Sequence, residues 1–213
     1  MLDWDHNAYY HRLLLGQMPQ RCRRVLDVGC GTGAFAAKLA QRSEHVDALD
    51  RSPEMIEEAA RRTPDNVNWV LADVLGEPLP GNDYDAIFSI CALHHMPLSD
   101  SLPVLAAALR PGGVLTAIVL PRPDLARELP VEIVASAAHR ILGAMFLAKR
   151  LLGSNGGFAK ESTRSTMPVV MDPPLTTRKV ANQAAQVLPG VRVRRLLFWR
   201  YLLIWQKPIT PDS

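Results

Sequence analysis

The stretch Val25-Leu-Asp-Val-Gly29-Cys-Gly31-Thr-Gly33-Ala34 decides the fold of this chain. It joins a short apolar run to three glycines placed at every second position. A short β-branched run that ends on glycine is typical of a buried strand in a parallel sheet. Glycines directly after such a strand let the backbone turn into a helix and approach a ligand closely. The stretch therefore predicts a strand, a ligand-binding turn and a helix, in that order.

Strand-like and helix-like segments alternate around this turn. Apolar patterns predict helices at 7–18, 34–42, 52–62 and 99–109 and strands at 24–28, 45–49, 66–71, 84–90 and 114–120. Such alternation is typical of βαβ units in a parallel sheet. We therefore expect an α/β fold with a Rossmann-like, doubly wound sheet.

The alternation stops after Pro121. A helix is predicted at 131–152 with Gly143 in its middle, then a loop at 153–174 and a helix at 176–188. Two β-rich runs, 191–197 and 200–206, are expected to pair as an antiparallel hairpin. A chain of 213 residues suits one domain. We divide it into an N-terminal cap helix (1–20), a cofactor-binding core (21–121), a lid or substrate insertion (122–175) and a closing helix and hairpin (176–207).

The composition is that of an ordinary globular chain, with 48% hydrophobic and 21% charged residues. It excludes a disordered regulator, a fibre and a disulfide-stapled scaffold. The longest run without a charged residue, 86–99, is too short to span a membrane, and the N-terminus lacks the features of a signal peptide. The three cysteines are odd in number and have no metal-ligand spacing, which favours a reducing cytoplasm and no metal site.

The glycine turn alone leaves two ligands open. As G-x-G-x-G it suits a nucleoside joined to methionine, and as G-x-G-x-x-A it suits a dinucleotide. Asp50, at the end of the second strand, suits both, because a carboxylate there can accept both hydroxyl groups of a ribose. The same carboxylate argues against a ribose that carries a 2′-phosphate.

Two further acids favour the nucleoside-methionine ligand. Asp27 lies two residues before the glycines, where its carboxylate can orient the turn or meet an ammonium group that a dinucleotide lacks. Asp73 follows the third predicted strand and can accept a hydrogen bond from an adenine amino group, while the N–H of Val74 faces the ring. The alternative that these acids only cap turns stays open.

Together these residues resemble the class I S-adenosylmethionine-dependent methyltransferases over about 24–121, and 191–206 looks like the last two strands of that fold. The resemblance implies a seven-stranded sheet whose last strand is antiparallel, and S-adenosylmethionine as cofactor. It implies glycines along the methionine and ribose, Asp50 at the ribose, and Asp73 with Val74 at the adenine. Cys30 is expected to fill space in the turn rather than act as a nucleophile. The predicted cofactor-binding residues are Asp27, Gly29, Cys30, Gly31, Gly33, Asp50, Arg51, Asp73 and Val74.

His94 and His95 are the candidate catalytic residues. They follow the fourth strand, at the sheet edge where ligands bind in open α/β folds. A general base is needed only if the acceptor must lose a proton. The Leu-His-His sequence resembles a turn that lines the methyl-transfer pocket in many small-molecule methyltransferases. We expect one histidine in the pocket and the other packed or exposed, and the alternative that both are structural stays open.

Candidate substrate residues lie in the cap helix and the insertion. Tyr9, Tyr10 and His11 could close over the methionine or touch the substrate, or instead form the buried face of an amphipathic helix. Guanidinium groups bind carboxylate and phosphate with two hydrogen bonds, so Arg122, Arg140 and Arg164 could hold an anionic substrate. Alternatively, these arginines form a solvated face, or the helix at 131–152 meets a membrane surface.

Charge is divided unevenly along the chain. Residues 1–121 hold 10 Lys and Arg against 15 Asp and Glu, and residues 122–213 hold 14 against 6. The acidic part contains the predicted cofactor residues and the basic part the predicted substrate cover. This division makes an acidic small molecule the first acceptor to test.

The sequence predicts a methyltransferase that acts on a small molecule, through O-methylation of an anionic or hydroxylated metabolite. We expect no nucleic acid partner and no stable membrane association, and the oligomeric state stays open. Two other functions remain to be separated from this one. An NAD-dependent oxidoreductase is disfavoured by Asp73 and by the lack of a Tyr-x-x-x-Lys pair, and a non-catalytic S-adenosylmethionine-binding regulator would show no turnover.

Overall fold

A seven-stranded sheet forms the centre of the computed structural model, which describes residues 5–61, 64–151 and 173–209. The order of the strands is β3-β2-β1-β4-β5-β7-β6. The first five strands are parallel, and β7 is antiparallel to both β5 and β6. The predicted α/β class and the closing hairpin are thereby confirmed. The strands are β1 (Arg24–Val28), β2 (His45–Asp50), β3 (Val67–Leu71), β4 (Tyr84–Ile90), β5 (Leu109–Val119), β6 (Arg192–Leu196) and β7 (Arg200–Gln206).

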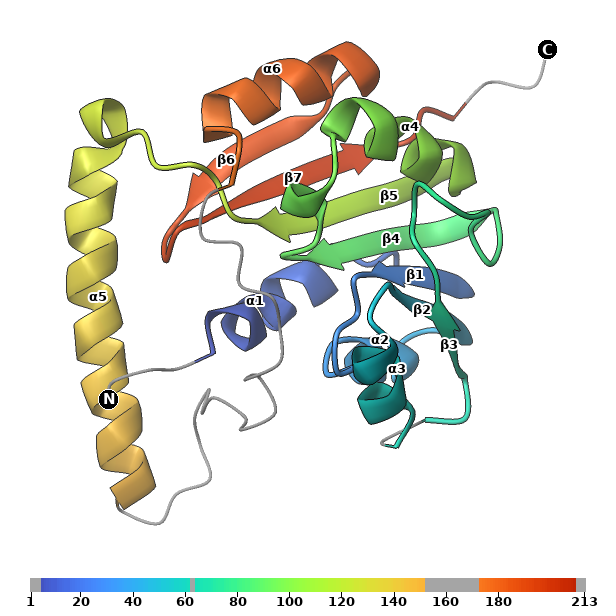
Figure 1. The fold of residues 1–213 in the computed structure, drawn as a ribbon, viewed down its shortest axis with the longest axis horizontal. Coiled ribbons are helices and arrows are strands. Elements are labelled where there is room, and N and C mark those ends of the chain that lie inside the picture. The colour runs from blue at the N-terminus through green and yellow to red at the C-terminus, as the bar shows by residue number, and fades with distance from the viewer. Residues whose placement is uncertain (1–4, 62–63, 152–172, 210–213) are drawn as a thin grey trace.

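Helices cover both faces of the sheet (Figure 1). Helices α4 and α6 lie on one face, and α1, α2 and α3 lie on the other. A short 3₁₀ helix, η1, connects β4 to α4. The helices are α1 (His6–Leu15), α2 (Ala36–Ala40), α3 (Pro53–Ala60), η1 (Leu93–His95), α4 (Leu98–Ala108), α5 (Leu125–Leu151) and α6 (Thr177–Val187).

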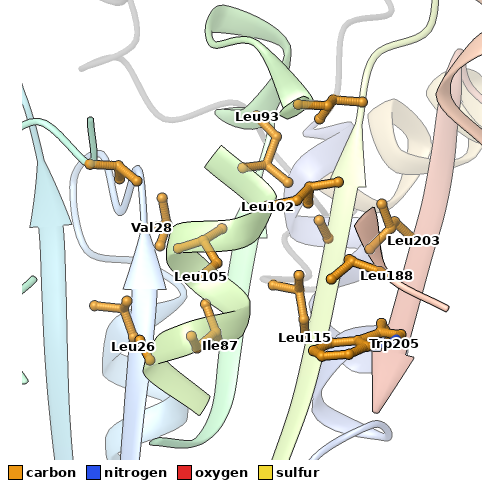
Figure 2. Packing of buried hydrophobic residues seen from close by; sticks show 14 of the residues in the cluster. Leu26, Val28, Ile87, Leu93, Leu102, Leu105, Leu115, Leu188, Leu203 and Trp205 are labelled. Atoms are coloured by element: carbon orange, nitrogen blue, oxygen red, sulfur yellow. The ribbon is translucent and has the colours of Figure 1, made fainter. Parts of the chain in front are cut away.

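The core is split by the sheet into two apolar layers. Successive side chains of a strand point to opposite faces, so Leu26 of β1 packs in the α4 layer while its neighbour Val25 packs in the α1 layer. Figure 2 shows Leu102 and Leu105 of α4 lying over the strands of the first layer. The central strands β1 and β4 are buried along almost their whole length.

Strand β5 begins five residues earlier than the sequence predicts. The segment Arg110-Pro-Gly-Gly113, which the sequence leaves between the predicted helix at 99–109 and the predicted strand at 114–120, forms a bulge inside β5, opposite Asp85 of β4. Two hydrogen bonds with Lys207 hold this bulge, from Gly112 N to Lys207 O and from Lys207 N to Gly113 O, each 2.9 Å. The partner that turns these residues into a strand is thus almost a hundred residues away.

Helix α5 is longer than predicted and is attached to the domain along one side. It starts at Leu125 and continues through Gly143, which is buried. Arg195 of β6 forms ion pairs with Glu128 (3.0 Å) and Glu132 (2.5 Å) of this helix. The indole N–H of Trp199 also donates to Glu132, at 2.6 Å. These contacts fasten the first half of α5 to the β6–β7 hairpin.

By length and composition, one helix of the described part of the chain could cross a membrane. The segment is Arg127–Lys149 of α5, and 11% of its most apolar window is buried inside the protein. The expectation based on charge-free runs did not detect it, because Glu132 and Arg140 interrupt an otherwise apolar run.

Candidate functional site

The turn after β1 is held against the end of β2. The N–H groups of Gly29 and Cys30 both donate to the carbonyl of Leu49, at 2.7 and 3.0 Å. Gly29 has a φ of +72°, and a Cβ at this position would overlap the Cβ of Ala92 behind it. Only glycine fits here, which leaves bare backbone at the sheet edge. Gly31 and Gly33 also have positive φ.

Asp50 connects the glycine turn to the next helix. Its Oδ2 accepts a hydrogen bond from the N–H of Gly31 and its Oδ1 from the N–H of Ser52, each at 2.9 Å. Ser52 in turn caps α3, because its Oγ accepts from the N–H of Met55 at 3.3 Å. The carboxylate is therefore held in one orientation at the end of β2, before any ligand binds.

A cavity of about 530 Å³ lies along this edge. This volume is within the range usual for small-molecule sites. The cavity runs across four neighbouring strands in sheet order, from Asp73 after β3, through Asp50 and Gly29, to Cys91 after β4. Of the predicted cofactor-binding residues, those that line it are Gly29, Gly31, Asp50, Arg51, Asp73 and Val74.

Asp27 and Cys30 lie behind the cavity wall. Asp27 is buried, and its Oδ2 has no hydrogen-bond partner within the described residues. Burial, and then the charge of Asp50, raise the pKa of Asp27 to about 7. Burial raises the pKa of the Cys30 thiol well above its usual range, and the Asp27 charge adds to this. Cys30 therefore stays protonated, as expected of a residue that fills space.

The two candidate histidines face different cavities. Both lie in η1, with ring centroids 4.0 Å apart. His95 lines the first cavity and also a second one of similar volume, about 530 Å³, whereas His94 lines only the second. Burial, the charge of His95 and the charge of Arg200 lower the pKa of His94 to about 4. Burial also lowers the pKa of His95, and Arg51 adds to this. Both rings are therefore neutral at pH 7.

The second cavity shares one wall with the first. His95, Met96 and Pro97 line both of them. Its opposite wall comes from α6, which contributes Gln183 and Gln186. The Nδ1 atom of His94 is buried and has no hydrogen-bond partner in the described part of the chain. His95 thus lines two compartments, one at the strand ends and the other lined mainly by apolar side chains, with Ser99, Gln183 and Gln186 as uncharged polar groups.

The cap helix α1 contributes a residue that the sequence did not suggest. Asn7 lines the first cavity at its Cys91 end, and its Oδ1 accepts hydrogen bonds from the Cys91 Sγ (3.2 Å) and from Nη2 of Arg200 (3.1 Å). Arg200 is the first residue of β7 and also donates to the carbonyls of Phe198 and Trp199. No local sequence signal marks Asn7, because both of its partners lie far along the chain.

The predicted aromatic residues of α1 do not line either cavity. The Tyr10 hydroxyl donates to the carbonyl of Leu197 at 2.6 Å, and the ring is buried. His11 is buried against the ring of Phe35, with centroids 4.9 Å apart, and its Nδ1 is 2.8 Å from Lys38 Nζ. Tyr9 is 38% exposed. These placements match the amphipathic-helix alternative, and they attach α1 to the hairpin and to α2.

Of the predicted substrate arginines, Arg122 and Arg140 do not line either cavity, and Arg164 is not among the described residues. Arg122 is exposed, and its N–H donates to the carbonyl of Leu175. Arg140 is exposed on α5, and Arg164 lies outside the described residues. Two other arginines reach the candidate site: Arg200 lies beside Asn7 and lowers the pKa of His94, and Arg51 lines the first cavity and lowers the pKa of His95.

Residues 25–113 match the family described as "Methyltransferase domain". Over its whole length the chain is similar to an uncharacterised methyltransferase of Mycobacterium tuberculosis, with 30% identity across 97% of this chain and 98% of that protein. A malonyl-[acyl-carrier protein] O-methyltransferase of Enterobacter lignolyticus is 32% identical across 74% of this chain and 66% of that protein.

Solved structures share the fold at low identity. A complex of DhpI with S-adenosylhomocysteine superposes with a TM-score of 0.63, at 19% identity, over 96% of this chain and 85% of that one. The N-methyltransferase NodS of Bradyrhizobium japonicum, also bound to S-adenosylhomocysteine, gives a TM-score of 0.59 at 18% identity, over 96% and 90% of the two chains.

Proposed function

The chain belongs to the class I S-adenosylmethionine-dependent methyltransferases, and from this premise we propose that it methylates an oxygen atom of a small molecule. Membership decides between the two ligands that the glycine turn leaves open, because the cofactor of the family is S-adenosylmethionine. The protein is therefore a transferase, and family membership excludes the alternative of an NAD-dependent oxidoreductase. The identity of the acceptor and the roles of single residues belong to the proposal.

The residues along the first cavity fit this cofactor. A volume of about 530 Å³ is large enough for a nucleoside joined to an amino acid. A Cβ at Gly29 would collide with Ala92, which also lines the cavity, so only bare backbone fits at this point of the wall. In the proposal Asp50 accepts the ribose hydroxyls, and Asp73 with the Val74 N–H holds the adenine. The remaining end, at Asn7 and Cys91, then receives the sulfonium.

Asp27 supplies the counter-charge for the ammonium group. Its unpartnered Oδ2 and raised pKa are those of a buried carboxylate that lacks a cation. A positive group on the other side of the glycine turn would favour the ionised form and offset its desolvation. The proposal therefore couples cofactor binding to the loss of a proton from Asp27.

When bound, S-adenosylmethionine supplies an electrophilic methyl group, so the protein mainly has to align and desolvate the acceptor. Both histidines of η1 are neutral and can accept a proton. The observation that carries the proposal is that His95 lines both cavities, which places a neutral base between the cofactor compartment and the second cavity. We assign the second cavity to the acceptor and the role of general base to His95.

The relative of Enterobacter lignolyticus supports oxygen as the acceptor atom, because it is named as an O-methyltransferase. The three free cysteines support a reducing, cytoplasmic location. The basic balance of residues 122–213 favours the long-range approach of an anionic acceptor, although none of the described lysines and arginines lines the second cavity.

Calorimetry with S-adenosylmethionine, S-adenosylhomocysteine and NAD tests the cofactor assignment. We expect micromolar binding of the two sulfur nucleosides and none of NAD. A panel of carboxylic acids, phenols and amines, assayed by the formation of S-adenosylhomocysteine, then tests the acceptor class. Turnover restricted to amines would exclude the proposed O-methylation, and tighter binding of NAD would exclude the cofactor assignment.

The pH dependence of binding tests the role of Asp27. Its pKa of about 7 in the free protein means that the carboxyl is largely protonated at pH 6 and largely ionised at pH 8. An ammonium group binds the ionised form, so affinity for S-adenosylhomocysteine should rise by roughly tenfold from pH 6 to pH 8. The variant Asp27→Asn should bind more weakly and show no such rise. A flat profile for the natural protein would remove the assignment.

A further inference from the structure

The outer face of α5, meaning the side turned away from the sheet, is apolar and exposed. Figure 1 shows this helix standing beside the domain, at the end to which β4 and β5 point. Large apolar side chains follow one another along the exposed side for most of its length. They are Leu129, Ile133, Val134, Ile141, Met145 and Leu147, with exposed fractions between 42% and 68%. A contiguous apolar face of this kind marks an interaction site.

The charges exposed on α5 all have the same sign. Among its described side chains, Arg127, Arg140 and Lys149 are exposed, whereas the acids Glu128 and Glu132 are partly buried and paired with Arg195 on the inner side. The outer face therefore combines apolar and cationic side chains. This is the pattern of helices that lie in the headgroup region of anionic bilayers.

The inner side of α5 is already occupied by the domain. Ala135 is fully buried, and His139 lies 3.1 Å from His6 of α1 between ring nitrogens. A helix that crosses a bilayer would have to break these contacts and the ion pairs of Arg195. Burial of 11% over its most apolar window also distinguishes α5 from the core helix of a globular protein. The helix is therefore placed to lie on a surface rather than to span it.

We propose that the outer face of α5 docks on an anionic lipid bilayer, with the helix parallel to the membrane plane. The segment Arg127–Lys149 of 23 residues is about 35 Å long, so the contact is extended. Its isoleucine and leucine side chains enter the headgroup–acyl boundary, and its basic side chains contact lipid phosphates. A second copy of the chain is a poorer occupant, because pairing two such faces brings cationic side chains together.

This docking has a consequence for the acceptor that rests on the proposed function. Helix α5 follows β5 and stands at the carboxyl edge of the sheet, where the cofactor cavity lies. A membrane-bound enzyme would thus turn this edge toward the lipid. The acceptor class that this arrangement favours is an amphiphile that resides in the bilayer and carries an oxygen nucleophile in its headgroup.

Vesicle flotation of the full chain tests the docking without any knowledge of the acceptor. Vesicles of phosphatidylcholine alone are compared with vesicles that also contain phosphatidylglycerol. We expect at least about tenfold more bound protein on the anionic vesicles, and loss of most of this excess at about 0.5 M salt, where charges are screened within a few ångströms. The double variant Ile133→Asp, Ile141→Asp should bind at least about tenfold less.

Matched variants separate the two components of the contact. Arg140→Gln with Lys149→Gln should lower binding to anionic vesicles while leaving the weak binding to neutral ones unchanged. Leu71 lies on the edge strand β3, and its side chain is 51% exposed. Leu71→Asp therefore controls for the addition of a negative charge at an apolar surface position outside α5. This variant should bind vesicles as the natural protein does. Light scattering after gel filtration reports whether any variant changes the oligomeric state.

Three results would overturn the proposal. The first is that the protein floats with neither kind of vesicle. The second is that it floats equally with both kinds, and that neither salt nor the glutamine variants change the bound amount. The third is that the chain binds no vesicles and forms a dimer that the isoleucine variants dissociate. Calorimetry with S-adenosylhomocysteine on the same preparations keeps the two proposals apart. Loss of vesicle binding with intact nucleoside binding contradicts the docking alone, and vesicle binding without nucleoside binding contradicts the proposed function alone.

Discussion

Replacing Asp50 with alanine is expected to weaken S-adenosylhomocysteine binding by at least about 100-fold. The carboxylate is positioned before binding, because it accepts hydrogen bonds from the N–H groups of Gly31 and Ser52. Two ribose hydroxyls would add two hydrogen bonds to a charged acceptor, each contributing about 1.5–3 kcal/mol. Their loss corresponds to roughly two to four orders of magnitude in the dissociation constant. Calorimetry at pH 8 measures the change.

Two companion variants make this result specific. Asp50→Asn keeps one oxygen acceptor but loses the charge, so its affinity should fall between those of the natural protein and the alanine variant. Glu57→Gln removes an acid that is exposed on α3 and does not line the cavity, and it should leave binding unchanged. A change below about fivefold in the alanine variant would contradict the assignment of Asp50 to the ribose.

Replacing Gly33 with valine is expected to lower the free energy of unfolding by about 2 to 5 kcal/mol. Gly33 has a φ of +78°, where a β-branched residue is strained by about 1–2 kcal/mol. Its Cβ would also overlap the ring of Trp69 and lie 3.2 Å from the Cβ of Ala59. Forcing atoms into a packed interior costs a further 1–3 kcal/mol, roughly. Urea unfolding followed by circular dichroism measures the loss.

Gly190 provides the matched control for Gly33. Its φ is +82°, almost the same, but nothing lies within 4 Å of a Cβ built on it. Gly190→Ala therefore carries the backbone cost alone, about 1 kcal/mol. Gly33→Ala should be clearly more destabilising than Gly190→Ala, because it adds the overlap with Trp69. If both alanine variants lose the same free energy of unfolding, the overlap with Trp69 behind the glycine turn does not contribute to the stability difference.

Most of the fold could be predicted because its signals are local. The run before Gly29 and the strands β2 and β4 are short and mostly apolar, which is typical of strands buried on both faces, although each contains an aspartate: Asp27, Asp47 and Asp85 respectively. The bulge at Arg110–Gly113 could not be predicted, because the residues suit a turn and only their pairing with Lys207 makes them part of a strand. The start of α5 was predicted six residues too late because Pro130, which usually stands at or before a helix start, lies inside this helix.

Residues of the candidate site likewise differ in whether a local sequence signal marks them. Asp50 and Asp73 follow strand ends, and strand ends can be located from the apolar pattern, so the sequence could predict that both lie along the same edge of the sheet. The aromatic side chains of α1 are substrate candidates in the sequence because binding groups are often aromatic. In the structure Tyr10 is buried, and its hydroxyl donates to the carbonyl of Leu197. Asn7 was missed because its position depends on Arg200, 193 residues away in the chain. Such a pairing leaves no trace in a single sequence.

The contacts between α1 and the β6–β7 hairpin also determine when the site is completed during synthesis. Helix α1 leaves the ribosome first, but Tyr10 finds its partner only at Leu197, and Asn7, which also contacts Cys91, finds its second partner only at Arg200. Strand β7 must insert between β5 and β6 before these partners are in place. A nascent chain that has formed β1 to β5 therefore has its glycine turn and its acids, but it lacks the hairpin contacts that fasten α1 beside the cavity.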